Sequence, residues 1–238
     1  MLLNVRVDGA GARTVVLLHG MTGSAESWWR VAERLVAVGH RVLAIDLPGH
    51  GLSARDSRLT IDSAARSVVE TVHAFAPGER VLAVGHSFGG MVLAAAHDDL
   101  RPALAVHVDA PLRLAGGQQR GQLVGFYEES RQQRTVERLR ATRPHYSERD
   151  VAVEARAAER FDPATAAAVS CGPGGLWLPG PGSIVLRADP SDYVSSEDVR
   201  LLEARGVDVR SVPGAAHTLW YSHFDEFCAA LPEVFTVG

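Results

Sequence analysis

Lysine is absent from this sequence, so all 24 of its basic residues are arginines. This absence excludes a lysine general base and a lysine Schiff base from any chemistry that the chain performs. The abundance of Ala, Arg, Gly and Val beside it is typical of a GC-rich bacterial genome, and we therefore expect a bacterial source.

Cysteine is also scarce. The two cysteines, Cys171 and Cys228, lie far apart, and no Cys/His cluster has metal-site spacing, so the sequence predicts no metal site. Two distant cysteines fit a reducing compartment better than a disulfide, and we expect the protein to be cytoplasmic.

Net charge is low and long apolar runs are missing. A formal charge of −4 favours neither nucleic acid nor an anionic membrane surface as a partner. The first residues lack a basic region followed by an apolar run, and no stretch is long enough to span a bilayer, so neither a signal peptide nor a membrane anchor is predicted. The length of 238 residues suits one α/β domain with a small inserted cap.

Short β-branched runs alternate with helical patterns along most of the chain. Strands are predicted at 2–7, 14–18, 41–45, 80–84, 103–108, 184–186 and 207–212. Helices are predicted at 24–38, 61–75, 91–98, 196–205 and 223–231. This alternation indicates an α/β fold, with a mostly parallel sheet covered by helices on both faces.

The alternation stops between 112 and 181. This segment has helical periodicity at 118–142 and 148–159, no convincing strand, and a Gly/Pro-rich end. A structureless loop of this length is improbable in a compact domain. We therefore predict an α/β core at 1–111 and 182–238 and a helical cap, or lid, at 112–181, inserted between two core strands.

The strongest local motif is Gly85-His86-Ser87-Phe88-Gly89, which matches G-x-S-x-G. It follows a predicted strand and precedes a helix of small residues, as a nucleophile elbow requires. The tight turn exposes the serine hydroxyl, and the glycines leave room for the crowded backbone. Ser87 is thus the candidate nucleophile.

His217 lies on the loop after the last predicted strand. A serine hydroxyl needs an adjacent base, and an imidazole titrates near neutral pH. A histidine at this place, after the serine and near the C-terminal end, has the chain order that this architecture uses. His217 is therefore the candidate general base.

Together these motifs resemble the α/β-hydrolase fold family along nearly the whole chain. The resemblance includes His19-Gly20 after the first strong strand and Asp46-Leu47-Pro48-Gly49-His50-Gly51-Leu52-Ser53 after the second. It implies an eight-stranded, mostly parallel sheet, although only one short strand precedes Thr14. It also implies an oxyanion hole formed by the backbone N–H groups of Met21 and Phe88, each worth about 10²–10³ in rate.

Three aspartates are candidates for the acid of the catalytic triad. The usual place is the loop after strand 184–186, where Ala188 replaces the common glycine and Ser191 stands at the common position of the acid. Asp192 is favoured, because a one-residue shift restores the familiar pattern. Asp189 and Asp109, the latter after the preceding core strand, are the alternatives.

Other residues carry weaker signals. His19, His50 and His86 are expected to support loops rather than transfer protons. Trp28 and Trp220 are the favoured walls of a substrate pocket. The cap arginines are expected to form a solvated face paired with glutamates rather than an anion clamp; they are Arg131, Arg134, Arg138, Arg140 and Arg143.

These residues predict an enzyme without a cofactor. Its partner would be a small molecule, and no oligomeric state is implied. The predicted reaction is hydrolysis of a small, largely hydrophobic ester, thioester or lactone through a Ser-His-Asp triad and an acyl-enzyme. The alternatives are a lyase, cyclase or cofactor-independent oxygenase on the same scaffold, or a catalytically silent ligand receptor.

Overall fold

A single main sheet organises the computed structural model, which describes residues 1–236. Its strands are β1 (Val5–Asp8), β2 (Arg13–Leu18), β3 (His40–Ile45), β4 (Leu82–His86), β5 (Leu104–Val108), β8 (Ile184–Asp189) and β9 (Asp208–Pro213). In residues 1–236 this sheet has seven strands in the order β1-β3-β2-β4-β5-β8-β9. Only β1 pairs antiparallel with its neighbour, and the other pairings are parallel.

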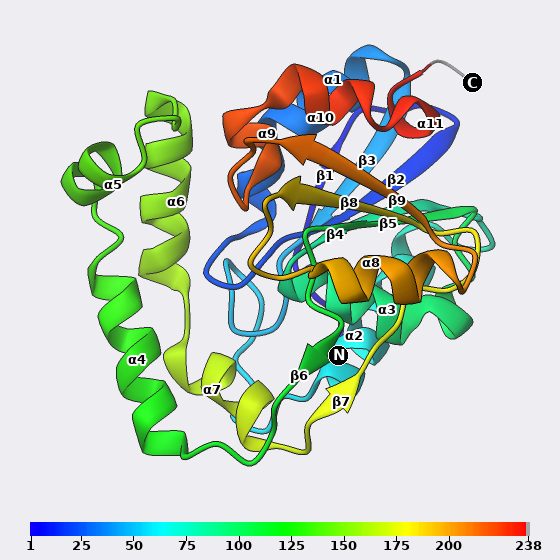
Figure 1. Cartoon of the computed structure of the whole chain (residues 1–238). Helices are drawn as coiled ribbons and strands as arrows, with labels where there is room; N and C mark the ends of the chain where they lie inside the picture. Colours follow the sequence, from blue (N-terminus) through cyan, green and yellow to red (C-terminus); the bar gives the residue numbers. More distant parts are fainter. Residues whose placement is uncertain (237–238) are drawn as a thin grey trace.

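Helices cover both faces of this sheet (Figure 1). One face carries η1 (Ala25–Trp28), α1 (Trp29–Ala37), α9 (Leu219–Ser222), α10 (Phe224–Ala229) and α11 (Pro232–Phe235). The other carries α2 (Ile61–Phe75), α3 (Phe88–Leu100) and α8 (Ser196–Glu203). The strands are buried on both faces because successive side chains alternate: Val15 and Leu17 join one core, and Val16 and Leu18 the other. The predicted α/β class is confirmed.

The segment between β5 and β8 folds as helices above one end of the sheet (Figure 1). They are α4 (Arg120–Gln132), α5 (Val136–Thr142), α6 (Glu148–Arg160) and α7 (Pro163–Cys171). A short antiparallel ribbon of β6 (Arg113–Leu114) and β7 (Gly175–Leu176) joins the two ends of this segment. We call residues 112–181 the cap.

Several predicted boundaries are corrected. The predicted helix at 118–142 is broken, because Thr135 leaves the helical conformation and its side chain caps α5 by accepting from the N–H of Arg138. The ribbon and α7 were not predicted. The helix predicted at 223–231 is observed as α10, and the short helices α9 and α11 on either side of it were not predicted. The described residues contain seven main-sheet strands rather than the eight that the resemblance implied.

None of the helices in residues 1–236 combines the length and apolarity needed to cross a lipid bilayer.

Candidate active site

Ser87 occupies a one-residue turn between β4 and α3. Its backbone has φ 49° and ψ −117°, a conformation that non-glycine residues rarely adopt. The turn is held at both ends, because the N–H of Ser87 donates to the carbonyl of Val108 at 2.9 Å and its own carbonyl accepts from Gly90 at 3.0 Å. The side chain therefore projects from the elbow at the carboxyl end of the parallel strands.

The two glycines of the motif are required by close backbone contacts. A Cβ on Gly85 would lie 2.5 Å from the carbonyl oxygen of Gly89, and one on Gly89 would lie 2.4 Å from the carbonyl oxygen of Leu18. Real side chains cannot approach backbone this closely. The absence of a side chain at Gly85 thus lets β4 turn tightly into α3, and its absence at Gly89 lets the elbow pack against the end of β2.

His217 hydrogen-bonds to Asp109. Its Nδ1 lies 2.7 Å from Oδ2 of Asp109, a carboxylate that is 1% exposed. The other carboxylate oxygen accepts from the N–H of Ala188 at 3.2 Å and the hydroxyl of Ser191 at 2.6 Å. This arrangement fixes the ring so that Nδ1 carries a proton and Nε2 is available as a base.

The preference for Asp192 as partner of His217 is therefore corrected in favour of Asp109. The side chain of Ser191 turns inward to Asp109, and the next residue, Asp192, is exposed. Asp189 is also exposed and pairs with Arg187 at 2.7 Å. The sequence did contain a signal against an acid in the loop after β8, since Ser191 stands at the common position of the acid there.

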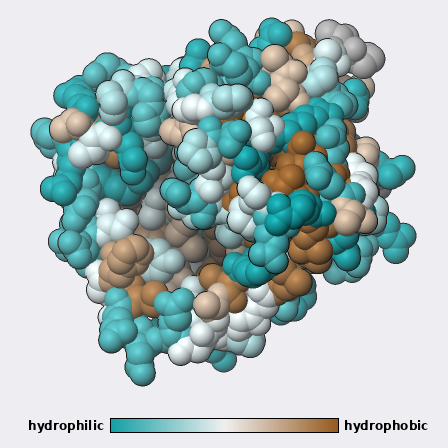
Figure 2. All heavy atoms as spheres, viewed as in Figure 1, coloured by the Kyte–Doolittle hydropathy of each residue, from teal (hydrophilic) through white to brown (hydrophobic). Residues whose placement is uncertain are grey.

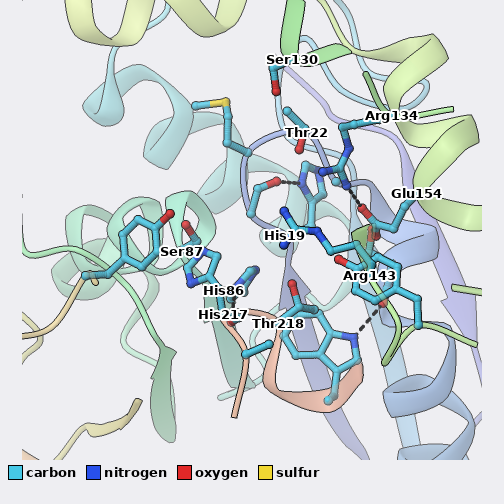
Figure 3. Close-up of a pocket in the computed structure, with 18 of the residues that line it drawn as sticks. His19, Thr22, His86, Ser87, Ser130, Arg134, Arg143, Glu154, His217 and Thr218 are labelled. Atoms are coloured by element: carbon cyan, nitrogen blue, oxygen red, sulfur yellow. Dashed lines mark hydrogen bonds and ion pairs between the residues drawn. The ribbon is translucent and has the colours of Figure 1, made fainter. Parts of the chain in front are cut away.

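Ser87 and His217 line one cavity of about 420 Å³ that opens between the core and the cap. Figure 3 labels Ser87, His86 and His217 side by side on one wall of this cavity. The ring centroids of His86 and His217 are 4.5 Å apart, and Tyr193 stacks on His217 at 4.0 Å. Within residues 1–236 no hydrogen bond joins Ser87 Oγ to the imidazole, a contact that often tightens only when substrate binds.

The backbone amides of Met21 and Phe88 have the properties that an oxyanion hole needs. Neither N–H donates to any acceptor in residues 1–236. Met21 lines the cavity, and Phe88 begins α3, whose N-terminal dipole favours negative charge. The loop holding Met21 approaches the elbow closely, because a Cβ on Gly20 would lie 2.7 Å from Nδ1 of His86.

Three buried histidines support these loops. The His19 ring accepts from the N–H of Leu47 at 3.0 Å, and the His50 ring accepts from the N–H of Thr22 at 3.3 Å. His86 Nε2 donates to the carbonyl of His217 at 3.0 Å. Burial lowers the pKa of His19, lowers the pKa of His50 to about 3, and takes the pKa of His86 well below its usual value. Their rings are neutral at neutral pH, which suits loop support.

The two predicted pocket tryptophans occupy different places. Trp220 lines the cavity. Trp28 is 0% exposed and stacks behind Trp220 at 4.0 Å, so it belongs to the core and its assignment to the pocket wall was wrong.

A buried polar cluster connects the cap to the core and was not predicted. Glu154, on cap helix α6, is 5% exposed and accepts from the hydroxyls of Ser27 at 2.7 Å and Tyr221 at 2.9 Å. Its other oxygen pairs with Arg134, also from the cap (Figure 3). Helical periodicity could not reveal this cluster, because its members meet only when α6 lies on η1.

The cavity is more polar than the sequence suggested. Its wall combines apolar and polar side chains; away from Ser87 and His217 these include Met21, Phe126, Tyr127, Ser130, Arg134, Arg143, His145, Tyr146, Glu154 and Thr218. A hollow between the mostly hydrophilic cap surface and the core is visible from outside in Figure 2. The cavity can therefore hold a small molecule that carries polar groups.

The prediction of a solvated arginine face holds for part of the cap. Arg131 pairs with Glu128 at 2.6 Å on the same helix, and Arg140 pairs with Glu148. Arg134 and Arg143 instead line the cavity, which that prediction did not anticipate. Residues 1–236 contain no group of three or more His, Cys, Asp or Glu side chains placed to hold a metal ion.

Comparison with known proteins agrees with this geometry. A model described as the alpha/beta hydrolase family matches residues 15–230. Esterase PIR7B from Oryza sativa subsp. japonica is 34% identical over 119 residues, which are 47% of this chain and 44% of that protein. Methylesterase 2 from Arabidopsis thaliana is 35% identical over 96 residues, 39% of this chain and 36% of that protein. The chain thus matches less than half the length of these curated relatives.

Solved structures resemble the chain over nearly its whole length. A thermophilic esterase from Thermogutta terrifontis has a TM-score of 0.76 and 18% sequence identity, covering 98% of this chain and 94% of that chain. At this identity the likeness concerns the fold alone.

Proposed function

The chain belongs to the alpha/beta hydrolase family, and on this premise we propose that it hydrolyses carboxylic esters with Ser87 as nucleophile, His217 as general base and Asp109 as the acid. The observation that carries the proposal is the Nδ1–Oδ2 hydrogen bond of 2.7 Å between His217 and Asp109, on a histidine that shares a cavity with the strained Ser87 elbow. The names of the relatives, an esterase and a methylesterase, support ester bonds as the target.

In the proposed acylation, Nε2 of His217 accepts the hydroxyl proton while Ser87 Oγ attacks the ester carbonyl carbon. The tetrahedral intermediate collapses, the protonated imidazole gives its proton to the leaving alcohol, and an acyl-enzyme remains. His217 then deprotonates a water molecule that attacks the acyl carbonyl. Collapse of the second tetrahedral intermediate breaks the bond to Ser87 Oγ, the imidazolium returns its proton to that oxygen, and the acid is released. Asp109 keeps the ring in the required tautomer and stabilises the imidazolium in both steps.

The N–H groups of Met21 and Phe88 would hold the oxyanion. Because both are backbone donors in fixed loops, they need no reorganisation when negative charge develops on the carbonyl oxygen. The freedom of both groups from other acceptors in residues 1–236 supports this role.

The cavity favours a small substrate. A volume of about 420 Å³ suits a small molecule rather than a polymer. The mixed wall favours an ester, thioester or lactone with at least one polar group beyond the scissile bond. In this respect the proposed substrate differs from the largely hydrophobic one predicted from the sequence.

The proposal is tested with Ser87→Ala and a panel of p-nitrophenyl esters, thioesters and lactones. Wild type should turn over at least one class and should be labelled covalently by a fluorophosphonate, whereas Ser87→Ala should lose both properties. Ser57→Ala, at an exposed loop serine, is the matched control and should behave as wild type. An active Ser87→Ala protein would contradict the proposal and favour non-hydrolytic chemistry on this scaffold.

A further inference from the structure

Nearly all arginines of the cap form an ion pair with a carboxylate or donate hydrogen bonds to backbone carbonyls of the protein. Their partners are Asp198 for Arg113, Glu128 for Arg131, Glu154 for Arg134, Glu148 for Arg140, Glu33 for Arg149 and Glu26 for Arg156 and Arg160. Arg120 donates to two backbone carbonyls. Within residues 1–236, the side chains of Arg138 and Arg143 have no such partner.

These two arginines differ in position. Arg138 is exposed on α5 and lies outside the cavity of Ser87. Arg143 follows the last turn of α5 and lines that cavity, while remaining exposed to solvent. In Figure 3 it is drawn among the residues around the cavity, together with Ser87 and Glu154. Arg143 is thus a cation at the opening of the site.

The charge of Arg143 is not balanced by the other ionisable groups of the wall. Among the lining residues the carboxylate is that of Glu154, and it is engaged by Arg134. Burial raises the pKa of Tyr146 to about 12 and raises the pKa of Tyr193, so both phenols are neutral at neutral pH. Burial and the nearby Arg143 lower the pKa of His145, so this ring is also neutral there.

We propose that Arg143 binds a carboxylate of the substrate, and that the substrate is therefore an ester that carries a free carboxylate away from its scissile bond. A guanidinium offers five donors in a planar arrangement that matches a carboxylate. The hydroxyls of Ser130 and Thr218 in the same wall are further donors to such a group. This inference deepens the proposed function and rests on it.

The kinetic test compares p-nitrophenyl hydrogen glutarate with its neutral methyl ester. The ratio of kcat/KM for the anionic ester to that for the neutral ester should fall by about 10- to 100-fold in Arg143→Gln, as expected when a hydrogen-bonded charge pair is lost. Arg143→Lys should keep part of the ratio. Arg138→Gln, the other unpartnered cap arginine, should keep the wild-type ratio. An unchanged ratio in Arg143→Gln would overturn the inference.

A binding test separates this inference from the proposed reaction. Monomethyl glutarate is titrated by calorimetry into Ser87→Ala and into Ser87→Ala/Arg143→Gln, with dimethyl glutarate as the neutral control. The second variant should bind the monoacid at least about 10-fold more weakly, and added salt should weaken the binding to Ser87→Ala. Equal binding by both variants would overturn the inference even if Ser87 proves catalytic. The expected difference would support carboxylate binding by Arg143 even if no ester is hydrolysed.

Discussion

The imidazole of His217 and the carboxylate of Asp109 are joined by a 2.7 Å hydrogen bond between residues 108 positions apart in the chain. Asp109 follows β5, the strand beside β4, and its backbone has φ 42°, in the left-handed region. Ser87, at the end of β4, also has a positive φ, of 49°. Two residues with positive φ thus lie at the ends of adjacent strands: Ser87 lines the cavity, and Asp109 is buried behind His217. Such backbone outliers are common at functional sites.

Asp109→Asn should therefore lower kcat for ester hydrolysis by about 10³- to 10⁴-fold, because an amide can stabilise the wrong tautomer of His217. Asp192→Asn is the matched control and should change kcat by less than about 2-fold, since surface substitutions away from a site have small effects. Steady-state kinetics decide the point, with thermal melting to confirm that both variants fold. A larger loss in Asp192→Asn than in Asp109→Asn would show that the acid is misassigned.

Ser191→Ala should lower kcat by about 10-fold. The Ser191 hydroxyl donates to Asp109 at 2.6 Å, and a hydrogen bond to a charged group contributes about 1.5–3 kcal/mol. Ser191 Oγ also accepts from the N–H groups of Tyr193 and Val194, both at 3.0 Å, so the loop that carries Tyr193 against His217 depends on it. Ser191→Thr keeps the hydroxyl and should recover most of the activity. Equal kcat for Ser191→Ala and wild type would refute a positioning role.

Glu154→Gln should destabilise the protein by about 2–4 kcal/mol in urea denaturation. The substitution leaves the guanidinium of Arg134, 18% exposed, without its counter-ion and weakens the contacts to Ser27 and Tyr221. Glu148→Gln is the control on the same helix, because the Glu148–Arg140 pair is largely exposed and screened by solvent, so its loss should change the stability much less. Faster proteolysis of the cap in Glu154→Gln alone would indicate that this cluster holds the cap on the core. Equal stability of the two variants would contradict the prediction.

The free energy of unfolding should fall as the pH decreases from about 6.5 to about 4. Burial lowers the pKa of His50 to about 3 and that of His107 to about 4, so the unfolded chain binds protons in this window that the folded protein does not. Stability therefore rises with pH there, by up to about 1.4 kcal/mol per pH unit for each such histidine.

His107→Gln should reduce the slope of the free energy of unfolding against pH, by up to about 1.4 kcal/mol per pH unit, because the contribution of one histidine is lost. The measurement is urea denaturation at several pH values between about 4 and 7, the window in which ordinary histidines titrate. His73→Gln, at an exposed histidine, is the control and should leave the slope as in wild type. A slope that does not respond to His107→Gln would show that this histidine is not the source.

The sequence alone predicted the structure correctly where steric constraints between neighbouring residues determine it. The Gly85–Gly89 motif predicted the elbow because only glycines permit the backbone contacts that surround Ser87. The alternation of strands and helices predicted the sheet, and the observed α2 has the predicted bounds, since Thr60 caps it and a buried apolar stripe follows.

Tertiary structure decided which distant side chains meet. The sequence offered three carboxylates for one imidazole. The order β4-β5-β8-β9 places Asp109 beside the elbow, and the inward turn of Ser191 leaves Asp192 in solvent. In the same way, helical spacing could not distinguish the cavity arginines Arg134 and Arg143 from their solvated neighbours. Such choices depend on how strand ends and packed helices are placed in space, and a periodic pattern in one chain segment carries no information about its distant partners.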